Sequence, residues 1–259
     1  MHVLDKIRAE MAKSTSRILN REMLRYNDVQ IILNSIKNGQ SSARKIFFDV
    51  PIKNIVGIFL KEFYFGEPGD TWRDIVNKRL DGIGWDDKVI TYFESDLLME
   101  KFPPLDSANE LRLACFGGVV FCLNGNHRLP AAIGWLVSKQ GDDAVLKKAS
   151  LLVWDTNSAV ISKIIEWRSR GYPVDFCDIN QHGSLRMAIR FQNEREIYRN
   201  FIVQDRNMVE VKAPLPDFNF WDGAIRSCKA WRPLPESFVE AWKNTSWLNG
   251  AAASPTIVD

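Results

Sequence analysis

The sequence contains no uncharged apolar stretch long enough to cross a bilayer, because the longest one of interest, Cys115–Leu123, is short and is interrupted by Gly117-Gly118. Its first residues mix acidic with basic side chains and contain no apolar block, so a secretory signal is not expected. These absences predict a soluble protein without a membrane span, located in the cytoplasm.

Cysteine is scarce, and the spacing of the four residues matches no disulfide framework, so we expect free thiols. A zinc site is not expected either, since the cysteines and His182 provide no close ligand pair at the usual spacing, and we assign no metal ligand. The cysteines are Cys115, Cys122, Cys177 and Cys228.

A strong charge of one sign is also absent. The net charge of +2 is too small to indicate duplex nucleic acid as an obligate partner. Residues 1–50 hold nine Lys or Arg against five Asp or Glu, which leaves two interpretations, a surface that touches nucleic acid or membrane and a solvated helix face. The sequence has no Walker motif, dinucleotide fingerprint or G-x-S-x-G elbow.

What the chain does contain is enough apolar surface for a core, with 46% hydrophobic residues, nine Trp and fifteen Phe. Its periodicity predicts a mixed α/β (α+β) fold, and we expect a helical region over 1–43, a core over 44–183 and a helical, aromatic-rich region over 184–259. The expected helices are 3–37, 71–80, 95–101, 128–136, 157–170, 184–201 and 236–242. The expected strands are 45–50, 54–65, 88–93, 111–116, 119–123, 148–154 and 174–179.

The clearest local feature is the turn Asn124–Arg128, which closes an apolar strand and opens a helix. A helix N-terminus presents unpaired backbone N–H groups and the positive end of the helix dipole, so anions bind there. Gly125 permits close approach of a phosphate, and Arg128 can hold two of its oxygens. The alternative is an ordinary strand-to-helix turn with two solvated basic residues.

The stretch Val119–Ala132 resembles the signature of the ParB/sulfiredoxin superfamily, in which a strand ends in a G-x-H-R or G-x-R-R turn followed by a helix of small residues. The resemblance covers about residues 85–155 and implies a ParB/sulfiredoxin-like mixed sheet core with flanking helices. It also implies that Gly125, Asn126, His127 and Arg128 bind the phosphates of ATP or another nucleotide, together with Mg²⁺.

The chain departs from some members of that superfamily. Asn126 stands where sulfiredoxins carry their catalytic Cys, so a sulfinic-acid reductase is not expected. Cys122 precedes the turn inside the strand, where a structural thiol is expected. The helix-turn-helix region of a partition protein is not recognisable.

Turnover of a nucleotide would need a carboxylate to place Mg²⁺ or to accept a proton. Glu94 and Asp96, after the expected strand 88–93, are the candidates, with helix capping as the alternative. His127 is a candidate general base, although the role of phosphate ligand is favoured. Asp175 and Asp178 are weaker candidates.

Two further features allow two interpretations each. Arg186 and Arg190 form either a second anion clamp or, through Glu194 at i,i+4 from Arg190, a helical ion pair, which is favoured. The aromatic residues after Phe218 form either a partner-binding surface or a lid over the core.

The resemblance therefore implies a bacterial, plasmid or phage nucleotide-binding protein, acting as an ATPase, kinase or nuclease by phosphoryl transfer or by phosphodiester or nucleotide hydrolysis. The alternative is a non-catalytic inhibitor or adaptor of the plasmid fertility-inhibition type, or a secreted effector. Its partners would be a nucleotide and either DNA or a protein.

Overall fold

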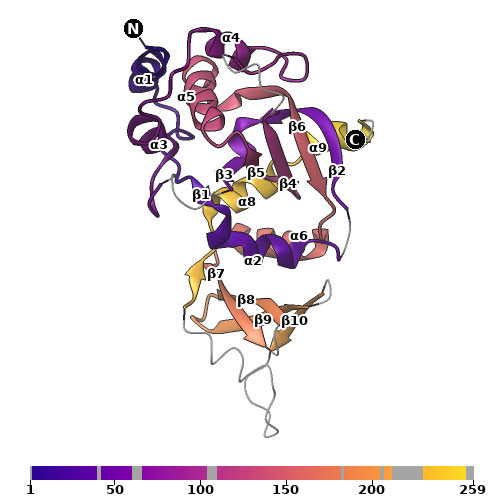
Figure 1. Ribbon diagram of the computed structural model, residues 1–259. Helices are drawn as coiled ribbons and strands as arrows, with labels where there is room; N and C mark the ends of the chain where they lie inside the picture. The colour runs from indigo at the N-terminus through magenta and orange to yellow at the C-terminus, as the bar shows by residue number, and fades with distance from the viewer. Residues whose placement is uncertain are drawn as a thin grey trace, which may run out of the picture.

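The computed structural model describes residues 2–39, 42–59, 66–103, 110–181, 184–204, 207–211 and 230–254. These residues form four layers (Figure 1): a group of helices, a six-stranded mixed sheet, a second group of helices and a five-stranded antiparallel sheet. The prediction of a mixed α/β fold with flanking helices is confirmed.

The six-stranded sheet has the order β1-β3-β5-β4-β6-β2. Strands β1, β3 and β5 run parallel, β4 and β5 form an antiparallel hairpin, β4 and β6 run parallel, and β6 and β2 run antiparallel. A side chain at Gly57 would clash with the carbonyl oxygen of Leu24, so glycine is what lets β1 pair with β3. The strands are β1 (Leu24–Arg25), β2 (Arg44–Pro51), β3 (Ile55–Ile58), β4 (Arg112–Phe116), β5 (Val119–Asn124) and β6 (Val145–Trp154).

Helices cover both faces of this sheet because its central strands are apolar on both sides. In β5, Val120 and Cys122 belong to one hydrophobic core, whereas Val119 and Phe121 belong to the other. The first core lies under α1 (Val3–Lys13), α3 (Trp72–Lys78), α4 (Lys88–Glu94) and α5 (Arg128–Gln140).

The second core fills the space between the two sheets around α2 (Tyr26–Ile36), α6 (Ser158–Ser169) and α8 (Glu236–Lys243). Phe238 and Trp242 are buried there, so for these two residues the interpretation as a lid over the core is confirmed. The second sheet has the order β10-β9-β8-β7-β11. Its strands are β7 (Val174–Gln181), β8 (Ser184–Gln192), β9 (Tyr198–Gln204), β10 (Asn207–Val211) and β11 (Arg232–Pro233).

The short elements complete the chain. The 3-10 turns η1 (Ile52–Asn54) and η2 (Gly141–Asp143) lie close to each other at the edge of the first sheet, and α9 (Leu248–Ala253) packs near β2.

The prediction of a helix over 184–201 is wrong, because these residues form β8 and β9 with a turn at Asn193–Glu196 between them. Met187, Ile189 and Phe191 belong to the second core, whereas Ala188 belongs to a separate cluster on the other face, which is the alternation of a strand. The second sheet therefore joins strand β7 of the predicted core to strands of the predicted C-terminal region.

The prediction of a strand over 88–93 is also wrong, since Lys88–Glu94 is the helix α4. Its buried residues Val89, Tyr92 and Phe93 have the i, i+3, i+4 spacing of one helix face. The helix expected over 95–101 is a turn capped by Asp96. The helix expected over 3–37 is interrupted by a turn and by β1.

Other predictions are confirmed: the strands expected over 111–116 and 119–123 are found as β4 and β5, and the helices expected over 128–136 and 157–170 are found as α5 and α6. Cys115 and Cys122 are free and buried, as expected. Cys177 is disulfide-bonded, so the prediction of free thiols is wrong there.

Candidate functional site

The turn Asn124–Arg128 lies where three parallel strands end. Arg25 is paired with Ile58 and Ile58 with Cys122, so β1, β3 and β5 bring their carboxyl ends to one edge of the sheet. Helices α2 and α5 both begin at this edge. In open α/β sheets, ligands bind in the crevice outside such strand ends.

Side chain-to-backbone hydrogen bonds fix the turn to its neighbours. Asn124 Nδ2 donates to the carbonyl oxygen of Glu110 at 2.9 Å, and Asn126 Nδ2 donates to that of Phe59 at 2.6 Å. The backbone N–H of Leu129 donates to the carbonyl oxygen of Gly125 at 2.9 Å, which starts the helix. The turn is thus held in one conformation before any ligand arrives.

Gly125 is required here by packing as well as by backbone geometry. Its φ of +95° lies in the region that L side chains avoid, and a Cβ there would lie 2.5 Å from Leu111 Cδ1. The same Cβ would lie 3.2 Å from Nε and Nη2 of Arg128. The space that we expected to admit a phosphate is filled by these two side chains.

Arg128 points inward, beneath the turn, and is only 7% exposed. Its Nη2 donates to the carbonyl oxygen of Glu110 at 3.4 Å, and its guanidinium lies 4.9 Å from the centroid of the Phe102 ring. Helical side chains run back toward the N-terminus of their helix, which brings this one under Gly125. In this arrangement Arg128 positions the turn, and a ligand at the rim would not contact its guanidinium.

His127 is the exposed side chain of the turn. Partial burial of the imidazole lowers the pKa of His127, so the ring is neutral near pH 7 and donates through one nitrogen. The Oδ1 atom of the neighbouring Asn126 is buried and accepts no hydrogen bond from the described residues.

A pair of stacked aromatic rings adjoins the turn. Tyr26 and Phe59 lie with ring centroids 3.8 Å apart at 22°, and Phe59 is the residue whose carbonyl oxygen binds Asn126. Both residues are half-buried, and burial raises the pKa of Tyr26, so its hydroxyl is neutral at pH 7. A flat apolar surface therefore stands beside the polar turn.

The structure does not bring the predicted catalytic carboxylates to this turn. Glu94 Oε1 accepts a hydrogen bond from Trp135 Nε1 at 2.8 Å, and Trp135 lies two turns along α5, roughly 10 Å from Arg128. Asp96 caps its own loop, where Oδ1 accepts from the backbone N–H of Leu98 at 3.0 Å. Asp96 therefore caps a turn and not a helix, so the helix-capping alternative is wrong for this residue.

Nothing in the described part of the chain gathers ligands for a metal ion. No group of three or more His, Cys, Asp or Glu side chains is placed to hold one among those residues. We therefore assign no step to Mg²⁺. The described residues also include no helix of the length and apolarity that a bilayer crossing requires.

The structure shows which partner Arg190 has. Arg190 binds Asp175 at 2.9 Å and lies over the rings of Tyr198 and Trp231, so the predicted ion pair with Glu194 is wrong. Glu194 instead accepts a hydrogen bond from the hydroxyl of Tyr172.

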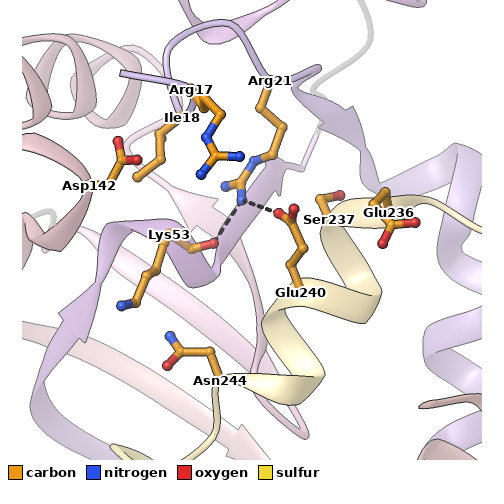
Figure 2. Close-up of a pocket in the computed structure, with 9 residues that line it drawn as sticks. All are labelled: Arg17, Ile18, Arg21, Lys53, Asp142, Glu236, Ser237, Glu240 and Asn244. Atoms are coloured by element: carbon orange, nitrogen blue, oxygen red, sulfur yellow. Dashed lines mark hydrogen bonds and ion pairs between the residues drawn. The ribbon is translucent and has the colours of Figure 1, made fainter. Parts of the chain in front are cut away.

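Sequence reasoning missed a pocket at the opposite edge of the sheet, where the loop after α1 meets η1 and α8 (Figure 2). Its residues come from four separate segments, and no local motif marks them.

Comparison of the chain with models of known protein families finds no match, and comparisons with curated proteins and with solved structures find none either.

Proposed function

We propose that the protein binds a nucleotide at the carboxyl edge of β1, β3 and β5 and acts as a binding protein. The observation that carries the proposal is the placement of the aromatic pair Tyr26–Phe59 directly beside a helix-opening turn that is fixed by hydrogen bonds. A nucleotide combines a flat base with phosphates. The resemblance of Val119–Ala132 to the ParB/sulfiredoxin signature supports the same ligand.

In this proposal the phosphate lies at the rim of the turn, where it accepts hydrogen bonds from the backbone and from His127. The dipole of α5 favours its charge. Arg128 holds the turn from below. The base packs against the exposed surface of Tyr26 and Phe59.

Binding without turnover is the form that the geometry favours. Glu94 and Asp96 are engaged with Trp135 and Leu98 away from the turn, so neither is placed to act on a phosphate there. A role as ATPase, kinase or nuclease would require a carboxylate beside the phosphate.

The first test is the thermal shift of the full chain with ATP, ADP and CTP, each with and without Mg²⁺. A nucleotide present at about 100 times its Kd would stabilise the native state by about 2.7 kcal/mol, which raises Tm on the order of 5 °C. No shift with any of the three nucleotides would overturn the proposal.

The variant His127→Glu separates binding from folding. A carboxylate at the N-terminus of α5 favours the helix but repels phosphate, so we expect an unchanged or raised Tm without ligand and loss of the nucleotide-induced shift. The matched control is Arg195→Gln, which lowers the net charge equally at an exposed turn of the second sheet and should keep the shift. Equal nucleotide-induced Tm shifts in the two variants would show that the turn is not part of the nucleotide site.

A further inference from the structure

The pocket in Figure 2 lies at the amino edge of β3, away from the turn at Asn124–Arg128. Lys53 lies in η1, which leads directly into β3, and the buried Asn54 donates to the carbonyl oxygen of Gly118, just before β5. The pocket has a volume of about 360 Å³. It is lined by Arg17, Ile18, Arg21, Lys53, Asp142, Glu236, Ser237, Glu240 and Asn244.

One wall of the pocket is rigid. The guanidinium of Arg21 donates to the carbonyl oxygens of Lys53 at 2.8 Å and Ile55 at 2.5 Å. Asn244 donates from Nδ2 to Asn54 Oδ1 at 2.6 Å, and its own carbonyl oxygen accepts from Asn54 at 3.0 Å. The groups that face the pocket are therefore held in position without a ligand.

Three cationic residues line this space. Arg17 is exposed, and among the described residues its guanidinium has no hydrogen bond or ion pair, while it points into the pocket in Figure 2. Arg21 has a buried Nε atom without a partner there. In the described part of the chain Lys53 has one ion pair, with Asp143, whose side chain is 92% exposed, and such pairs are weak.

The acidic residues of the lining offset the charge of Arg21 in part and leave that of Arg17 without an ion pair among the described residues. Glu236 forms its ion pair with Arg168, and Asp142 accepts a hydrogen bond from the hydroxyl of Ser16. Glu240 forms a long ion pair with Arg21, at 3.9 Å (Figure 2). These carboxylates and the side chain of Asn244 can, however, accept hydrogen bonds from a ligand that carries hydroxyl groups.

We propose that this pocket binds a small hydroxylated organic anion, with its phosphate or carboxylate group between Arg17, Arg21 and Lys53 and its hydroxyl groups toward Glu240 and Asn244. Guanidinium and ammonium groups bind both kinds of anion by charge-assisted hydrogen bonds. The site is separate from the proposed nucleotide site, because the two lie at opposite edges of the same parallel strands.

Isothermal titration of the full chain tests the proposal with four probes: glycerol 3-phosphate, malate, inorganic phosphate and glycerol. We expect glycerol 3-phosphate or malate to bind. Binding of the first would identify the anionic group of the ligand as a phosphate, and binding of the second would identify it as a carboxylate. Inorganic phosphate should bind more weakly and glycerol not at all. Absence of binding by both organic anions at millimolar concentration would overturn the proposal.

Arg17→Gln should weaken that binding at least tenfold, and it should leave Tm unchanged without ligand because Arg17 holds no partner among the described residues. Arg195→Gln removes the same charge elsewhere and should leave the affinity unchanged. Equal affinity in wild type and Arg17→Gln would overturn the proposal. His127→Glu should keep this binding and Arg17→Gln should keep nucleotide binding, so the two proposals can fail separately.

Discussion

At the scale of single residues, Gly125 carries the tightest constraint of the candidate nucleotide site. We predict that Gly125→Ala destabilises the protein by about 3 kcal/mol, because φ at +95° is strained for alanine and the new Cβ meets Leu111 at 2.5 Å. Gly171 has a φ of +80° with open space around it, so Gly171→Ala should show only the smaller backbone cost. Urea denaturation of both variants measures the difference in their free energies of unfolding. Equal losses of stability in the two variants would contradict the packing described at Gly125.

The residue scale also shows what the sequence can predict of this site and what it cannot. The strand, the positive φ of glycine and the helix start follow from neighbouring residues, and all three are found. The inward direction of the Arg128 side chain cannot be predicted from neighbouring residues. Its contacts are the carbonyl oxygen of Glu110 and the ring of Phe102, which a remote segment supplies.

At the scale of elements, α3 is stabilised by a capping box. Thr71 accepts from the backbone N–H of Asp74 at 3.2 Å, and Asp74 accepts from that of Thr71 at 3.0 Å. Hydrogen bonds from Lys78 and then Thr71 lower the pKa of Asp74 to about 2. Thr71→Ala should cost about 1 kcal/mol of stability by loss of the cap.

Because the folded-state pKa of Asp74 lies below its ordinary value of 3.8, this carboxylate stabilises the protein above about pH 4. That contribution is lost as the pH falls through about 2. We predict that Asp74→Asn flattens the dependence of unfolding free energy on pH between these limits, as measured by urea denaturation at several pH values. An unaltered pH dependence in the variant would contradict the role given to the carboxylate.

The two elements predicted wrongly have physical causes. Arg186 and Arg190 are four residues apart, a spacing that places two side chains on one face of a strand and also on one face of a helix. The apolar run in Lys88–Phe93 is short enough to suit either structure, and its packing against α5 selects the helix α4. Glu94 was predicted to lie near the turn because it would end that strand. Since the segment is a helix, Glu94 lies away from the candidate site.

At the scale of the whole molecule, Asn54 joins segments far apart in the sequence. Fully buried, it donates to the carbonyl oxygens of Gly118 and Asn244 and accepts from the side chain of Asn244, so it holds α8 against the first sheet. We predict that Asn54→Ala costs about 3 kcal/mol, because buried carbonyl oxygens lose their donor. A loss below about 0.5 kcal/mol in urea denaturation, as for a surface substitution, would show that α8 docks by other contacts.

The claim that a nucleotide phosphate meets the backbone at the start of α5 is tested most directly by ¹H–¹⁵N NMR titration of the labelled chain with ATP. The amide signals of Gly125, Asn126, His127 and Arg128 should shift together and saturate, while those of Arg17 and Arg21 at the opposite edge stay in place. Saturable shifts that spare Gly125–Arg128, or no shifts at all, would contradict the account.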